Sequence, residues 1–185
     1  MLKRLVGFVF AVCLSMILTQ EAFSQANIGL MGIGAKLGFV DPEGAGSVIG
    51  FGALVDLGTI TPDIMLEGNL DYWSDSESGG GVEVSFRDLI IGGTAKYMFK
   101  SSNPNFRPFA GGGIAFHFFK AAIDFAGTTQ ADSDNSETKL GIHVGGGLFY
   151  TLSPQLDLIA DGRYSIVSDA SQLAIQGGVV YKLTK

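Results

Sequence analysis

Apolar residues recur at every second position through most of the chain after residue 27, and this alternation is what most restricts the possible folds. Side chains of a strand point alternately to its two faces, whereas a helix needs apolar residues at i, i+3, i+4 and i+7. That helical spacing is hard to find in the same region. The alternation predicts eight strands, at residues 28–40, 48–58, 64–73, 86–99, 107–119, 138–152, 155–167 and 172–183.

The predicted strands are unusually long, at 10 to 15 residues each. Strands of soluble proteins most often have about 5–6 residues. A tilted strand that crosses a bilayer needs about 9–11. The lengths therefore favour strands that span a membrane and extend a little beyond it.

The two faces of these strands differ in charge. One face is apolar and uncharged, and the other carries charged residues on seven of the eight strands, together with many glycines. An eight-stranded barrel is only wide enough inside for packed side chains, so the large apolar face would overfill it. We therefore expect the apolar face to meet lipid and the charged face to line the lumen. The expected lumen charge network, with a structural role, consists of Lys36, Asp56, Glu67, Asp71, Lys96, Asp161 and Arg163.

Aromatic residues support this assignment of the faces. All five tyrosines fall on the apolar face and near strand ends. Membrane barrels carry such aromatic girdles where the hydrocarbon meets water. The expected lipid-interface aromatics are Tyr72, Tyr97, Tyr150, Tyr164 and Tyr181.

The amino terminus has the layout of a secretory signal peptide. Lys3 and Arg4 precede an apolar stretch at residues 5–18, which is followed by a more polar segment with small residues at its end. We expect cleavage near Ala26, which leaves residues 27–185 as one barrel domain. The only cysteine, Cys13, would be removed with residues 1–26. The formal net charge of −6 argues against a nucleic-acid partner, since phosphate binding needs clustered Lys and Arg.

One short run adds a resemblance to these patterns. Residues 107–113, Arg-Pro-Phe-Ala-Gly-Gly-Gly, resemble the R-P-aromatic-x-G-x-G run of small Gram-negative outer-membrane barrels. These include the OmpA transmembrane domain, OmpX-like proteins and opacity-type barrels. The resemblance implies an all-β protein: a closed antiparallel up-and-down eight-stranded transmembrane β-barrel. It also implies a monomer in the cell outer membrane, in contact with lipids and lipopolysaccharide.

The connections suggest where a partner would bind. Counted from a periplasmic amino terminus, the inner turns are short, and the longest outer loops are residues 74–85 and 120–137. Both loops are acidic. We therefore expect a structural or surface-interaction role, with any extracellular partner contacting these two loops.

No grouping of residues predicts catalysis, a cofactor or a metal ion. His117 and His143 lie almost equally far from the middle of the loop at 120–137, so we expect them to face each other as lumen histidines. Ser165, His143 and Asp88 could be assembled into a triad, but no local motif supports that grouping. Two alternatives stay open: a soluble periplasmic lipocalin-like ligand-binding barrel, and an outer-membrane lipid-modifying enzyme.

Overall fold

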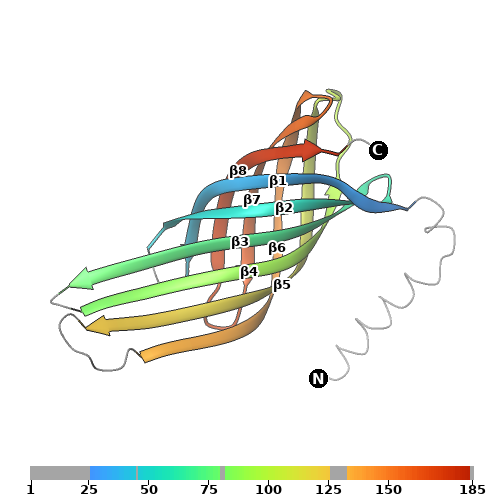
Figure 1. The fold of residues 1–185 in the computed structure, drawn as a ribbon. Coiled ribbons are helices and arrows are strands. Elements are labelled where there is room, and N and C mark those ends of the chain that lie inside the picture. The colour runs from blue at the N-terminus through green and yellow to red at the C-terminus, as the bar shows by residue number, and fades with distance from the viewer. Residues whose placement is uncertain (1–25, 45, 80–81, 126–132, 184–185) are drawn as a thin grey trace, which may run out of the picture.

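The computed structural model describes residues 26–44, 46–79, 82–125 and 133–183, which form a closed barrel of eight antiparallel strands (Figure 1). Each strand pairs with the next in the chain, and β8 pairs with β1. This confirms the predicted fold class. Residues 1–25 of the predicted signal peptide lie outside the described part of the chain. The strands are β1 (Asn27–Pro42), β2 (Val48–Thr61), β3 (Ile64–Gly79), β4 (Val82–Met98), β5 (Phe106–Phe125), β6 (Ser133–Ser153), β7 (Leu156–Ile166) and β8 (Gln172–Lys182).

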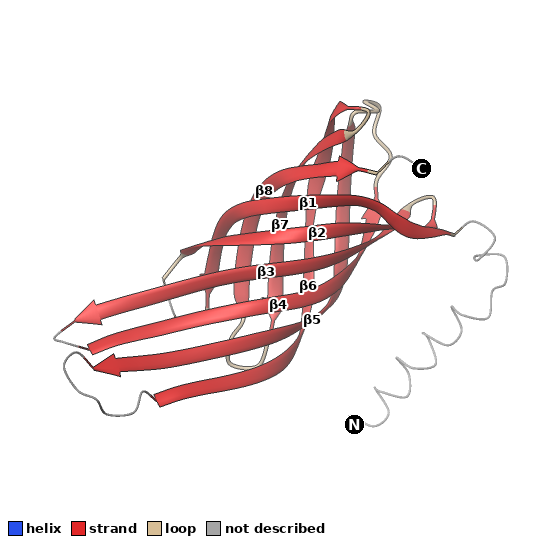
Figure 2. Ribbon diagram, viewed as in Figure 1, coloured by secondary structure: helices blue, strands red, loops and turns tan. Residues whose placement is uncertain are grey.

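The barrel has two unlike ends. We call the end with the short connections between β2 and β3, β4 and β5, and β6 and β7 the base, and the opposite end the mouth. At the mouth, β3 to β6 continue well past the other strands, as Figure 2 shows. Among the described residues, no helix is long and apolar enough to cross a membrane.

The two long outer loops predicted from the sequence are wrong in extent. The pairing of β3 with β4 continues to Gly79 and Val82, and that of β5 with β6 continues to Ile123 and Ser133. Most of 74–85 and 120–137 is therefore strand, apart from residues 80–81 and 126–132, which are not described. Residues 82–86 do alternate, with apolar Val82, Val84 and Phe86, so this part of β4 could have been predicted from the sequence. Residues 74–79 contain no apolar side chain larger than glycine, and only cross-strand pairing reveals them as strand. We call the paired residues 74–79, 82–87, 120–125 and 133–138 the projecting sheet.

Within the barrel wall the large apolar side chains point away from the lumen. Phe39, Ile49 and Leu140 are each more than 60% exposed. A soluble lipocalin-like barrel would bury this face inside, so the structure contradicts that alternative. A closed ladder with an apolar exterior is what a hydrocarbon solvent requires, because every backbone polar group is then paired within the wall.

The five tyrosines lie on this outward face at two levels. Tyr97, Tyr150 and Tyr181 pair with the first residues of β3, β5 and β7 at the base. Tyr72 and Tyr164 lie nearer the mouth, where Tyr72 packs against Phe51 with ring centroids 5.3 Å apart. The apolar belt lies between the two levels.

Two apolar clusters fill part of the lumen. The cluster nearer the base consists of Leu54, Met65, Phe109, Phe149, Ile159 and Val180. The cluster nearer the mouth consists of Val40, Trp73, Ile90, Ala115 and Ala174. The lumen is therefore packed in layers, with charged side chains and apolar side chains sharing the interior.

A charge placed on the outward belt tests the assignment of the faces. Ile114→Arg changes a residue that is 56% exposed and lies between the two tyrosine levels. In lipid this should lower the free energy of unfolding by about 2–4 kcal/mol, because the charge must enter hydrocarbon. Denaturant titration in liposomes, followed by the gel mobility of unboiled protein, measures the loss.

The matched control is Ser76→Arg, an exposed position in the projecting sheet. It should change the free energy of unfolding by less than about 0.5 kcal/mol, as surface substitutions usually do. Equal stability of the two variants would show that Ile114 does not face lipid.

Candidate functional site

Buried ion pairs occupy the middle of the lumen. The Lys96 Nζ atom lies 2.5 Å from Glu67 Oε2, and both side chains are almost fully buried. The Phe109 and Phe149 ring centroids lie 4.4 and 5.2 Å from the same ammonium. The ammonium is thus held by one carboxylate and two aromatic faces, which replace the water that burial removes.

Asp71 organises a second group nearer the mouth. It accepts hydrogen bonds from Arg163 at 2.7 Å and from Asn69 at 2.8 Å. Lys36 lies 4.0 Å from Asp71 and donates to Asp161 at 3.2 Å. Two cations thus face two carboxylates, so the group carries little net charge.

A third group, at the base, was not part of the predicted network. Buried Asp157 accepts from Lys182 at 2.8 Å and pairs with Arg107. Asp157 and Lys182 both fall on the charged phase of their strands, so that phase could have identified them. Asp56 was predicted to join the network, but it accepts the backbone N–H of Gly58 at 2.8 Å and has no ion pair with any described residue.

Glycine makes room for these groups. A Cβ atom at Gly52 would lie only 2.2 Å from Asp71 Oδ1, so no larger residue fits opposite that carboxylate without displacing it. The space left over is small. A cavity of about 20 Å³ lies among Glu67, Lys96, His143 and Arg163. That is room for about one water molecule.

The two lumen histidines do not face each other. His117 pairs across the sheet with Lys139, and His143 pairs with Gly113. The prediction is wrong because equal distance from the loop does not fix the register of the two strands. The partner of His117 is Lys139, four residues before His143 in β6. His117 Nδ1 lies 2.7 Å from Asp88 Oδ2, and His143 Nε2 lies 2.8 Å from Thr94 Oγ1.

This arrangement leaves the hypothetical triad unassembled. His143 is the cross-strand neighbour of Ser165, yet Asp88 is bound to the other histidine. Among the described residues, no three His, Cys, Asp or Glu side chains are grouped so that they could hold a metal ion.

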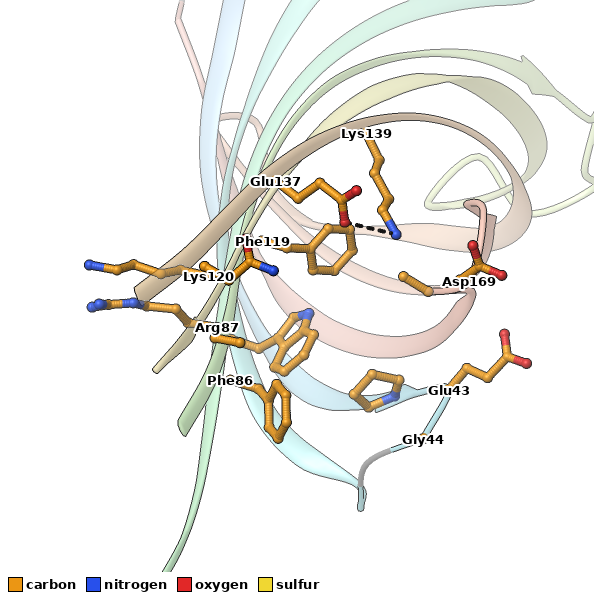
Figure 3. Close-up of a pocket in the computed structure, with 14 residues that line it drawn as sticks. Glu43, Gly44, Phe86, Arg87, Phe119, Lys120, Glu137, Lys139 and Asp169 are labelled. Carbon is orange, nitrogen blue, oxygen red and sulfur yellow. Dashed lines mark ion pairs between the residues drawn. The ribbon is translucent and has the colours of Figure 1, made fainter. Parts of the chain in front are cut away.

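A cavity of about 230 Å³ opens at the mouth, on the inner side of the projecting sheet. Trp73, Phe86 and Phe119 line it, and Glu43 and Asp169 reach it from the two hairpin loops opposite (Figure 3). Trp73 is buried and donates its indole N–H to Gln172 at 2.8 Å. The sequence prediction missed this cavity, although Trp73 lies on the same strand phase as Asp71.

The family follows from a comparison of the whole chain. Residues 10–182 match the family model described as the outer membrane protein beta-barrel domain. The chain belongs to this family. Its place is accordingly the outer membrane, and the outward apolar belt is its lipid-facing surface.

Solved barrels of this kind share the fold at low sequence identity. Neisserial surface protein A matches at 22% identity with a TM-score of 0.63, covering 85% of this chain and 99% of its own. Ail, the attachment invasion locus protein of Yersinia pestis, matches at 15% identity with a TM-score of 0.58, covering 83% of this chain and 97% of its own. A major outer membrane protein from Thermus thermophilus matches at 12% identity with a TM-score of 0.61, covering 83% of this chain and 98% of its own. No curated protein matches this chain.

Removing one partner from the Asp71 group tests its contribution to this barrel. Arg163→Ala leaves Asp71 with only the more distant Lys36 as a counter-charge. The free energy of unfolding should fall by about 3–5 kcal/mol, because a buried carboxylate loses its bonded cation. Denaturant titration in liposomes measures the change.

Two further variants separate charge from packing. Arg163→Met combined with Asp71→Asn removes both charges and should recover most of the loss, since paired replacement of a buried ion pair is often neutral. Arg87→Ala removes an exposed arginine and should stay within about 0.5 kcal/mol of the parent protein. An unchanged unfolding midpoint for Arg163→Ala would remove the network from the account of stability.

Proposed function

We propose that this outer-membrane barrel has a closed lumen and acts by surface contact through its projecting sheet, and that it is not an enzyme. The lumen charges then have a structural role, holding the wall around a packed interior. The observation that carries the proposal is the four-stranded sheet that continues past the barrel with unpaired edges, above a filled lumen.

The mouth is taken to face the cell exterior. Outer-membrane barrels have short periplasmic turns and longer extracellular connections. Here the base has the short connections and the mouth has the long hairpins. The chain acts as a monomer in this proposal, because closure leaves no unpaired strand in the wall.

Lipid contacts follow from the same orientation. The outward apolar belt meets the hydrocarbon of the outer membrane. Just beyond it, Arg87 and Lys120 are cross-strand neighbours on the outer face of the projecting sheet. Their charged ends extend away from the mouth cavity, on the same side (Figure 3). These two cations support the proposed contact with the phosphates of lipopolysaccharide.

The edges of the projecting sheet supply the contact surface. The pairing of β2 with β3 ends at Trp73, and the pairing of β6 with β7 ends at Ile142. Beyond these residues, β3 and β6 have no partner strand on their outer sides among the described residues. An unpaired edge recruits an extended polypeptide by backbone hydrogen bonding. We therefore propose that the partner is an extended segment of another protein.

The ligand bound to one structural relative is not the ligand that we propose for this chain. Ail was solved in complex with the heparin analogue sucrose octasulfate, a polyanion. The mouth of this chain presents the carboxylates of Glu43, Glu137 and Asp169. The same lining also includes Arg87, Lys120 and Lys139, so the mouth is not a basic surface of the kind that favours a polyanion, and the edges of the sheet are the better supported contact.

A closed lumen predicts no ion conduction. Purified protein in a planar bilayer should give no stepwise conductance, because the ion pairs and the two apolar clusters leave no continuous path. A large porin in the same bilayer serves as the positive control. Reproducible steps that vanish when the protein is boiled first would contradict the closed lumen.

Shortening the projecting sheet tests the contact. A variant in which Asn-Gly replaces residues 76–85 and 121–135 joins Asp75 to Phe86 and Lys120 to Ser136, each already a cross-strand pair. Peptides selected from a displayed random library on the full chain should not bind this variant. Their binding should slow amide hydrogen exchange at residues 76–79 of the full chain, because the amides on this edge of β3, which the variant lacks, become hydrogen-bonded.

The control is the barrel itself. The shortened variant should keep the gel mobility of the unboiled parent, since the wall is untouched. Selected peptides that bind the parent and the shortened variant equally would place the contact elsewhere.

A further inference from the structure

We propose that the mouth cavity is a binding site for a small organic cation with an apolar body, such as an alkylammonium compound. This goes beyond contact through the sheet edges, because the ligand is a small molecule and the site is a cavity on the inner face of the sheet. The argument rests on the floor of the cavity, the charges around it and the two loops that close it.

The floor is aromatic and held in place. The indole of Trp73 is fixed by its hydrogen bond to Gln172. Phe119 is half-buried and stacks on His117, with ring centroids 5.5 Å apart and planes 13° apart. Phe86 is 45% exposed beside them. Aromatic faces attract cations because their π-clouds are negative, and they also accept an apolar chain.

Three acidic and three basic residues line the cavity. Glu43 and Asp169 line it, and neither has an ion pair with any described residue. Glu137 also lines it and lies 3.2 Å from Lys139 Nζ, which donates as well to the Ser168 carbonyl. Three acidic residues thus surround the cavity, and its one inward ammonium, that of Lys139, is already engaged and lies 5.8 Å from the centroid of the Phe119 ring.

The other cations near the cavity do not offset this excess. The side chains of Arg87 and Lys120 border the cavity only by their stems, and Figure 3 shows their charged groups extending away from it. They lie on the opposite face of the sheet from Phe86 and Phe119, as strand alternation requires. The cavity thus combines aromatic faces with uncompensated carboxylates, which suits a cation and disfavours an anion.

The two acidic loops form one wall. Glu43 donates its backbone N–H to the Ser171 carbonyl at 2.8 Å, which ties the β1–β2 loop to the β7–β8 loop. Asp169 has a φ of 57°, and Ser171 Oγ donates to the Val167 carbonyl at 3.2 Å. The backbone of the two acidic loops is therefore held together before a ligand arrives, and the volume of about 230 Å³ suits a small ligand rather than a folded partner.

The protein carries its own reporter for this site. Trp73 is the only tryptophan in the chain, so its fluorescence reports on the cavity alone. Full-length protein in phosphatidylcholine nanodiscs is titrated with hexyltrimethylammonium, hexanol or hexanoate. The cation should change the Trp73 emission along a saturating curve, and the other two probes should bind at least about tenfold more weakly.

A charge-removing variant separates recognition from partition into lipid. Glu43→Gln with Asp169→Asn keeps the shape of the wall, and asparagine tolerates the left-handed backbone at position 169. Its affinity for hexyltrimethylammonium should fall by about tenfold. Asp63→Asn, in the base connection between β2 and β3, should bind like the parent protein.

Three results would overturn the proposal. One is a response that rises without saturation for all three probes, which is partition into the bilayer. The second is equal affinity for hexanol and for the cation. The third is unchanged cation affinity in the Glu43→Gln, Asp169→Asn variant while its unboiled gel mobility shows a folded barrel.

Discussion

Closure of the backbone ladder is the constraint on which the rest of the structure depends. In hydrocarbon no water is available to pair with a strand edge, so the sheet must end on itself. Here β8 meets β1 along a register that runs from Gly32 and Lys182 to Pro42 and Gln172. Eight strands closed in this way leave a narrow lumen. Its charges consequently lie in pairs, and glycines such as Gly52 provide the space that a carboxylate needs.

At the start of the projecting sheet the two faces of β4 change character. In the wall, β4 turns Leu89 and Ile91 outward and buries Asp88 and Ile90. Immediately before Asp88, towards the mouth, Arg87 lies on the outer face and Phe86 on the inner face. On β4 the charged side chain is therefore on the outer face here, whereas β6 keeps polar Glu137 and Lys139 on the inner face. The edges can then stay open, and an apolar floor forms on the side that the lipid does not reach.

The candidate sites show how far alternation predicts chemistry. It places Lys36, Glu67, Asp71, Lys96 and Arg163 on the lumen face, where the structure has them. Alternation predicts which face of a strand a side chain occupies, but not its position along the barrel axis. That position depends on strand register and on the stagger of the closed sheet. That is why Asp88 binds His117 and not His143, and why Asp56, although it is the cross-strand neighbour of Glu67, has no ion pair with any described residue. Trp73 was overlooked because a tryptophan on the charged phase signals nothing by itself.

The sequence by itself determined the eight-strand pattern, the closed barrel and the direction of its apolar face. These follow from local periodicity and from the amount of apolar surface, both of which a single chain displays without knowledge of its partners. Only the tertiary structure decided which charges pair, how far β3 to β6 continue, and that three aromatic side chains meet two acidic loops at the mouth. Those features join residues far apart in the chain, and strand register, which local periodicity does not encode, brings them together.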